Sequence, residues 1–134
     1  MKVCILGSEG QIGSYFQVKC KTKNIEFNSV DIKLDVNHDL RIMNDAWIDL
    51  IEKSDVVVFL AFDVGGANYL RKHQESYKFL INNTSMMMNV FEIVERLNKR
   101  VIFASSVTAF DIKNSYGNLL IINGLLFFAT ISLN

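Results

Sequence analysis

The run ILGSEGQIGSYF near the start of the chain constrains the fold most, because it places Gly7, Gly10 and Gly13 between an apolar segment and a helical pattern. Residues 2–7 predict a strand, and residues 11–22 predict the beginning of a helix. In such a strand–turn–helix the first glycine permits a tight turn and the second lets the backbone approach a pyrophosphate. The third lets the helix pack closely on the sheet. The spacing therefore predicts a phosphate-binding turn.

The first helical residues and the next acid extend this prediction to a dinucleotide. The backbone N–H groups of Gln11 and Ile12 would face the phosphates at the positive end of the helix. Asp31 ends a predicted strand over residues 25–31 and stands 18 residues after Gly13. An acid at this place accepts hydrogen bonds from a ribose 2′-OH and repels a 2′-phosphate, which favours NAD over NADP. The alternative is an incidental aspartate at the end of a strand.

Other acids are less specific signals. Asp39 and Leu40 lie in residues 37–42, where the sequence predicts the end of a third short strand. An Asp there would meet the adenine amino group of the cofactor, and a solvated turn acid or a helix cap is the equally weighted alternative. Asp63 and Glu75 flank a later loop and are expected to be solvated.

Short apolar segments alternate with helical patterns along the rest of the chain. Residues 44–54 predict a helix with one apolar face and Asn44 as its cap. Residues 55–61 and 100–106 predict strands buried on both faces, with a long helix over residues 75–97 between them. This order of elements predicts an α/β fold with a doubly wound parallel sheet and helices on both faces.

The long helix carries an amide inside its apolar stripe. The stripe advances in steps of three and four residues and consists of Phe79, Asn83, Met87, Val90, Phe91, Val94 and Leu97. A buried amide needs hydrogen-bond partners. Asn83 is therefore expected to bond either the backbone of a neighbouring strand or the loop that carries a cofactor, and Met86, Met87 and Met88 are expected to fill the core.

The charges of the chain are unevenly distributed. All 28 Asp, Glu, Lys and Arg residues (14 acidic and 14 basic) lie at or before Lys113, and the formal net charge is zero. A neutral chain has no electrostatic footprint for nucleic acid. The later apolar segment is interrupted by Asn123 and Gly124 and is shorter than the roughly 20 residues that span a bilayer, so no membrane partner is expected. His38 and His73 lack metal-ligand spacing with the cysteines, so no metal site is expected.

The glycine turn, Asp31 and the runs FLAF and VIFASSVTAF together carry a resemblance to a known family. The chain resembles the extended short-chain dehydrogenase/reductase family, and more narrowly its NAD-dependent nucleotide-sugar epimerases and dehydratases. The resemblance covers residues 1–117 and implies a Rossmann-type NAD-binding domain, a nucleotide-sugar substrate and a role in surface polysaccharide synthesis. A cytoplasmic location is expected from the sequence itself, because the apolar run at the N-terminus is too short for a signal peptide and nothing directs residues 1–113 out of the cytoplasm. Besides the glycines, Asp31 and Asp39, the resemblance implies cofactor contacts from Leu60, Ala61, Phe62, Asn83 and Ser105.

The resemblance also implies catalytic residues. Tyr116 matches the Tyr of the family's YxxxK motif and would take a proton from a sugar hydroxyl while hydride moves to NAD. Ser106 matches the Ser that orients and polarises the same oxygen. Leu120 stands where the family has the Lys that lowers the pKa of the Tyr, and free tyrosine has a pKa near 10. Lys113 is expected not to replace that Lys, because it lies upstream of Tyr116.

Residues 118–134 depart from the family pattern and are interpreted as an atypical, uncharged apolar tail. The sequence therefore predicts the N-terminal cofactor-binding part of an enzyme whose C-terminal substrate domain is missing. A catalytically inactive NAD-binding module and a truncated or frameshifted product are the alternatives. A homodimer that forms through the long helices is a further expectation.

Overall fold

Parallel pairing around the first strand organises the sheet. The computed structural model describes every residue except 66, 106–126 and 132–134. Strand β1 (Lys2–Leu6) pairs in parallel with β2 (Glu26–Val30) on one side and with β3 (Val56–Phe59) on the other. The chain therefore reverses its direction of travel across the sheet between β1 and β3, which is where open parallel sheets bind ligands.

Two further strands complete the order β2-β1-β3-β4-β5. Strand β4 (Arg100–Ser105) pairs in parallel with β3, so the parallel sheet predicted from the sequence is confirmed, with four parallel strands. Strand β5 (Phe127–Ile131) pairs antiparallel with β4. The sequence did not predict this strand, which lies in the uncharged segment after Lys113.

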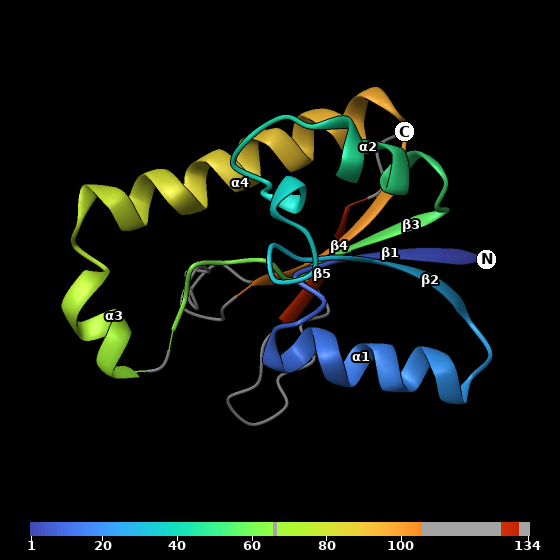
Figure 1. Cartoon of the computed structure of the whole chain (residues 1–134), viewed down its shortest axis with the longest axis horizontal. Helices are drawn as coiled ribbons and strands as arrows, with labels where there is room; N and C mark the ends of the chain where they lie inside the picture. The colour runs from blue at the N-terminus through green and yellow to red at the C-terminus, as the bar shows by residue number, and fades with distance from the viewer. Residues whose placement is uncertain (66, 106–126, 132–134) are drawn as a thin grey trace, which may run out of the picture.

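Helices cover both faces of the sheet, as the sequence predicted (Figure 1). Helix α1 (Gln11–Thr22) lies on one face, and α2 (Asp45–Glu52) and α4 (Tyr77–Arg96) lie on the other. A short helix, α3 (Ala67–His73), precedes α4 near its N-terminal end.

Alternation along the strands builds one core on each face, because successive strand side chains point to opposite sides. The larger cluster packs α2 and α4 on the sheet and contains Cys4, Leu6, Val30, Leu40, Trp47, Ile51, Val57, Phe59, Val90, Ile93, Val94 and Val101. The smaller cluster lies under α1 and contains Val3, Ile5, Cys20 and Val58. Both faces of the central strands are therefore dry, as is typical of parallel sheets.

Side-chain caps fix where α2 and α4 begin. The side chain of Asn44 accepts a hydrogen bond from the N–H of Ala46 at 2.9 Å, so the predicted cap of α2 is confirmed. The side chain of Ser76 accepts one from the N–H of Phe79 at 3.2 Å, which starts α4 two residues later than the pattern suggested.

Two local predictions were wrong. Residues 37–42 form no strand: a 3-10 helix, η1 (Val36–His38), is followed by a turn, because Asp35 caps the N–H of Asn37 at 2.8 Å. Met87 is 37% exposed and Met88 is exposed, whereas Met86 packs against the core.

Candidate cofactor-binding cleft

A cleft lies at the carboxyl ends of β1, β2 and β3, where the chain reverses direction across the sheet. Its volume is about 380 Å³. Its walls are formed by residues at or after the strand ends, by the turn after η1 and by α4, namely Gly7, Gly10, Val30, Asp31, Ile32, Lys33, His38, Asp39, Leu40, Arg41, Leu60, Ala61, Phe62, Asp63, Asn82 and Met86. The location and the mixed lining are typical of a site for a small organic ligand.

The glycine turn, residues 7–13, is held so closely that side chains do not fit. Gly7 has a φ of +85°, in the region that favours glycine, and a Cβ there would lie 2.7 Å from the backbone N of Ala61. A Cβ on Gly13 would collide with the backbone O of Gly7 and lie 2.8 Å from the Cα of Ser8. Gly13 therefore lets α1 pack on the turn itself.

The start of α1 is open toward a ligand. Gly10 is the N-cap residue of α1, and no side chain caps the helix there. A Cβ on Gly10 would approach only the O of Gly7, at 3.2 Å, and Gly10 lines the cleft. The first N–H groups of a helix carry partial positive charge and bind anions. This end of α1 therefore fits a phosphate group.

Asp31 ties the glycine turn to the end of β2. Its Oδ2 accepts a hydrogen bond from the N–H of Glu9 at 2.9 Å, and its Oδ1 accepts one from the N–H of Lys33 at 3.0 Å. Each carboxylate oxygen has two lone pairs, so each keeps an acceptor position. Asp31 lines the cleft, and it can therefore position the turn and accept a ligand hydroxyl at the same time.

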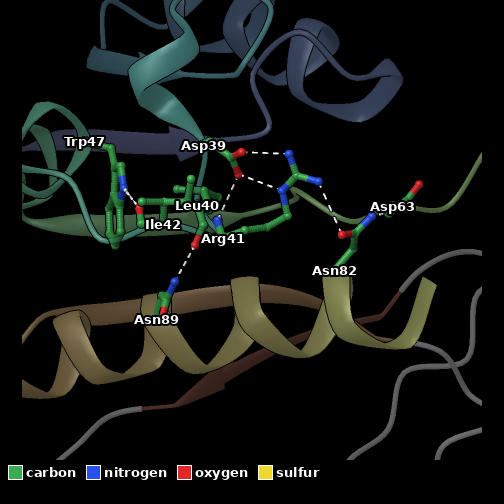
Figure 2. A network of polar contacts seen from close by, with 8 residues as sticks. All are labelled: Asp39, Leu40, Arg41, Ile42, Trp47, Asp63, Asn82 and Asn89. Carbon is green, nitrogen blue, oxygen red and sulfur yellow. Dashed lines mark hydrogen bonds and ion pairs between the residues drawn. The ribbon is translucent and has the colours of Figure 1, made fainter. Parts of the chain in front are cut away.

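Asp39 forms an ion pair with Arg41 in the opposite wall (Figure 2). Oδ1 of Asp39 accepts hydrogen bonds from Nε of Arg41 at 2.8 Å and from the backbone N–H of Arg41 at 3.0 Å. Oδ2 of Asp39 accepts a hydrogen bond from Nη2 of Arg41 at 2.7 Å. The hydrogen bonds from Arg41 lower the pKa of Asp39, and Asp39 in turn raises the pKa of Arg41. Asp39 is the C-cap residue of η1, and its carboxylate is mostly shielded from solvent, with its charge balanced by Arg41 within the wall.

Asp63, in the loop after β3, has a hydrogen-bond partner for each of its polar atoms. Its Oδ2 accepts from Nδ2 of Asn82 at 2.9 Å, and its Oδ1 accepts from the hydroxyl of Tyr69 at 2.7 Å. Its backbone N–H donates to Oδ1 of Asn83 at 2.8 Å, and its backbone O accepts from Nδ2 of Asn83 at 3.3 Å. The hydrogen bonds from Asn82 and Tyr69 lower the pKa of Asp63, so the predicted solvated acid is an anchored carboxylate.

One more contact joins the Asp39–Arg41 ion pair to the hydrogen bonds of Asp63. Nη1 of Arg41 donates to Oδ1 of Asn82 at 3.3 Å, so polar contacts run unbroken through Asp39, Arg41, Asn82, Asp63 and Tyr69. These five residues are called the polar network below. Figure 2 shows that Arg41 reaches from the turn after η1 toward α4, where Asn82 and Asn89 lie. All members except Tyr69 line the cleft.

The sequence-predicted cofactor residues divide into three groups. Those that line the cleft are Gly7, Gly10, Asp31, Asp39, Leu40, Leu60, Ala61 and Phe62. Those that support it without lining it are Gln11, Ile12, Gly13 and Asn83. Ser105 ends β4, and the position of its side chain lies outside the described part of the chain, as do Ser106, Tyr116 and Leu120.

Sequence reasoning missed most of the residues that give the second wall its polarity. Lys33, Arg41 and Asn82 were not singled out, and His38 was considered only as a metal ligand. The spacing of Asp39 and Arg41 could have predicted their ion pair, because an Arg two residues after an Asp in a turn can reach back to its carboxylate. His38 lines the cleft, and its buried Nδ1 has no hydrogen-bond partner among the described residues. An unpaired polar atom in the wall fits a ligand with its own polar groups.

The described residues contain no helix that is long and apolar enough to cross a bilayer. Within the same residues, no three His, Cys, Asp or Glu side chains lie close enough together to hold a metal ion.

Comparisons with known proteins agree with the fold. The sequence matches the model of the NAD dependent epimerase/dehydratase family over residues 3–118. No curated protein sequence matches. Similar solved structures include a GDP-L-fucose synthetase from Naegleria fowleri, with 19% identity and a TM-score of 0.57 over 88% of this chain and 34% of that one. A UDP-N-acetylglucosamine 4-epimerase from Bacillus cereus has 18% identity and a TM-score of 0.54 over 87% of this chain and 39% of its own.

A third similar structure is a dTDP-4-dehydrorhamnose reductase from Clostridium acetobutylicum, with 20% identity and a TM-score of 0.52. It aligns over 75% of this chain and 34% of its own. At these identities the likeness concerns the fold alone. The chain spans between about a third and two fifths of the length of these three structures.

Proposed function

Because the chain belongs to the NAD dependent epimerase/dehydratase family, we propose that its cleft binds a nicotinamide dinucleotide. The glycine turn carries this proposal: its backbone excludes side chains at Gly7 and Gly13 and leaves Gly10 open beside an uncapped helix start. A pyrophosphate is the group that such a turn accommodates. The dinucleotide, when bound, would supply the group that accepts hydride in the redox reaction proposed below.

The proposed contacts follow the cleft from one side to the other. The N–H groups of Gln11 and Ile12 would hold the pyrophosphate, and Asp31 would accept a hydrogen bond from the ribose of the adenosine half. Asp39 and Leu40 would contact the adenine. On the β3 side, Leu60, Ala61 and Phe62 would lie beside the other ribose, with Asn83 and Ser105 in support.

We further propose a preference for NAD over NADP. The carboxylate of Asp31 would accept a 2′-OH and repel a 2′-phosphate. Lys33 also lines the cleft, and its Nζ donates to the backbone O of Glu9 at 3.4 Å. The synthetase from Naegleria fowleri has also been solved with NADP bound.

Calorimetric titration of the purified chain with NADH and NADPH tests both proposals. NADH should bind at least about tenfold more tightly than NADPH, a difference of about 1.4 kcal/mol. Asp31→Asn should reduce that ratio. Asp35→Asn should leave it unchanged, because the side chain of Asp35 does not line the cleft and an amide oxygen can also accept the hydrogen bond from the N–H of Asn37. An absence of binding to either nucleotide would contradict the cofactor proposal, and equal binding would contradict only the preference.

For the whole enzyme we propose reversible hydride transfer between a carbon of a nucleotide sugar and NAD. Tyr116 would take the proton from the sugar hydroxyl, and Ser106 would orient and polarise the same oxygen. A turnover assay that follows NADH absorbance with a panel of nucleotide sugars measures this activity. Loss of activity in Tyr116→Phe, with NADH affinity retained, is the expected result.

A second candidate is a module that binds NAD without turning over a sugar. Leu120, four residues after Tyr116, favours it, because no ammonium group is supplied there to lower the pKa of the Tyr. Retained NADH binding with no turnover at high enzyme concentration would support the module. Measurable turnover would exclude it.

A homodimer through the long helices is proposed from the outer face of α4. Tyr77, Leu80, Ile81 and Met88 are each at least 60% exposed, and their spacing places them on one side of the helix. Sedimentation at increasing concentration should detect a dimer that Ile81→Glu dissociates. A monomer at all concentrations would contradict this proposal.

A cytoplasmic location is proposed from the thiols. Cys4 and Cys20 are free and buried, and burial raises the pKa of Cys4 to about 12. Free thiols are typical of reducing compartments. Fluorescence microscopy of a tagged chain would check the location.

A further inference from the structure

The side-chain amide of Asn82 is oriented by opposite charges on its two sides. Its Oδ1 accepts from Nη1 of Arg41 at 3.3 Å, and its Nδ2 donates to Oδ2 of Asp63 at 2.9 Å (Figure 2). A flipped amide would place its NH2 group against the guanidinium and its oxygen against the carboxylate. The two charged neighbours therefore hold the amide in one orientation.

These neighbours belong to different parts of the cleft. Arg41 lies in the segment that follows β2, and this segment supplies the proposed adenosine contacts. Asp63 lies in the loop that follows β3, next to the residues proposed to contact the other ribose. Since β2 and β3 flank β1 on opposite sides, Asn82 connects segments that leave the sheet on either side of the glycine turn.

The far end of the network lies outside the cleft. The hydroxyl of Tyr69 donates to Oδ1 of Asp63 at 2.7 Å, and Tyr69 does not line the cleft. A Cβ on Gly65 would lie within 2.8 Å of three atoms of the Tyr69 side chain, so the glycine lets that ring lie against the loop. The loop and α3 are thus arranged to bring one hydroxyl to Asp63.

From these contacts we propose that Asn82 is a positioning residue, which couples the β3 loop to Arg41 and thereby makes dinucleotide affinity depend on Tyr69. The inference rests on the proposed function, because the affinity concerned is that for NADH. Contacting members of a hydrogen-bond network commonly have interaction free energies that make their substitutions non-additive. Substitutions at Tyr69 and Asn82 should therefore not act independently.

A double-mutant cycle on NADH affinity tests the coupling. Tyr69→Phe removes only the hydroxyl and should weaken NADH binding about threefold in the otherwise native chain. In the Asn82→Leu background the same change should alter affinity by less than about 1.3-fold, because the route from Asp63 to Arg41 is gone. Equal effects of Tyr69→Phe in the two backgrounds would overturn the inference.

Asn89 supplies the matched control. It is also an amide of α4, and its Nδ2 donates to the backbone O of Leu40 at 2.9 Å, so it anchors the same turn without touching Arg41 or Asp63. In an Asn89→Leu background Tyr69→Phe should keep its full threefold effect. Loss of the effect in both backgrounds would identify general loosening of α4 and overturn the specific role of Asn82.

The outcomes for the inference and for the proposed function are distinct. If the native chain binds no NADH, the cofactor proposal fails and the inference fails with it. If the native chain binds NADH, and the fold-changes in affinity caused by Tyr69→Phe and Asn82→Leu simply multiply in the double variant, only the inference fails. Circular dichroism confirms that each variant is folded, and Asn82→Ala replaces Asn82→Leu if the latter does not fold.

Discussion

The two walls of the cleft are made of different parts of the polypeptide. In the glycine turn, the backbone itself forms the wall, and the positions of Gly7 and Gly13 exclude even a Cβ atom. In the polar network, side chains from the turn after η1, the β3 loop and α4 form the wall through hydrogen bonds at their tips, and Tyr69 of α3 supports them from outside the cleft. One wall depends on close backbone packing, and the other depends on charge and orientation.

This difference predicts how each wall responds to change. Backbone packing responds to added volume and is insensitive to salt, because no charge is involved. A network of partly exposed ion pairs and hydrogen bonds responds to charge, pH and ionic strength, and water replaces a lost contact at modest cost. Variants that add volume to the first wall should therefore be more harmful than those that remove groups from the second.

The largest effect is expected from Gly13→Ala. The new Cβ would collide with the O of Gly7, so either α1 or the turn must move, and we expect a loss of about 3 kcal/mol in the free energy of unfolding. Gly10→Ala is the matched control: its Cβ would approach one atom at 3.2 Å, and it should cost at most about 1 kcal/mol. Urea unfolding measures both, and equal losses would contradict backbone packing as the cause.

The next effect is expected from Asn83→Leu, at the border between the two walls. The change removes the acceptor of the Asp63 N–H and the donor to its O, which leaves two partly buried backbone groups of Asp63 unpaired. We expect a loss of about 2 kcal/mol in the free energy of unfolding. Asn82→Leu loses only contacts between side-chain tips and should cost about 1 kcal/mol. The reverse order in urea unfolding would show that the polar network, and not the pairing of the Asp63 backbone groups with Asn83, holds the loop.

A smaller effect is expected from Arg41→Met. The change breaks the ion pair with Asp39, and the side chain of Arg41 in this pair is 39% exposed. The free energy of unfolding should therefore fall by about 0.5–1 kcal/mol at low salt and by less at high salt. Lys53→Met breaks a more exposed pair with Asp49 at 3.6 Å and should change stability by less than about 0.3 kcal/mol. Losses that do not depend on salt would contradict an electrostatic role for Arg41.

The smallest effect concerns pH. The pKa values of Asp39 and Asp63 are both lowered in the folded chain, so their contribution to stability is present above their ordinary pKa of about 4 and is lost as the pH falls through the lowered values. Urea midpoints measured from about pH 6 down to about pH 2.5 should therefore fall more steeply in the native chain than in Arg41→Met. Parallel curves for the two proteins would contradict the assigned cause of the Asp39 shift.

The first wall was predictable from the sequence, and the second was not. The glycine turn depends on residues within one short stretch, where the order strand, turn and helix restricts each position. The contact of Arg41 with Asn82 joins residues 41 positions apart and depends on which atoms of each side chain meet. No local spacing specifies that meeting.

The same distinction explains the smaller errors. Asn44 was recognised as a cap because its partner is two residues away. Strand β5 was missed because its partner, β4, precedes it by more than 20 residues and pairing at that distance leaves no local pattern. Asn83 was noticed as an amide among apolar residues, yet only the fold identifies its partners as the backbone N–H and O of Asp63.

The contact between Gly7 and Ala61 also has a mechanical consequence. The N–H of Leu60 donates to the O of Leu6 at 2.8 Å, and the next peptide unit lies against the α-carbon of Gly7 without room for a methyl group. The two walls thus share a rigid floor that offers no hinge. We expect any widening that admits a large ligand to involve the polar network, where Arg41 and Asn82 are joined by a 3.3 Å hydrogen bond. That contact is the one we expect to break first when the cleft opens.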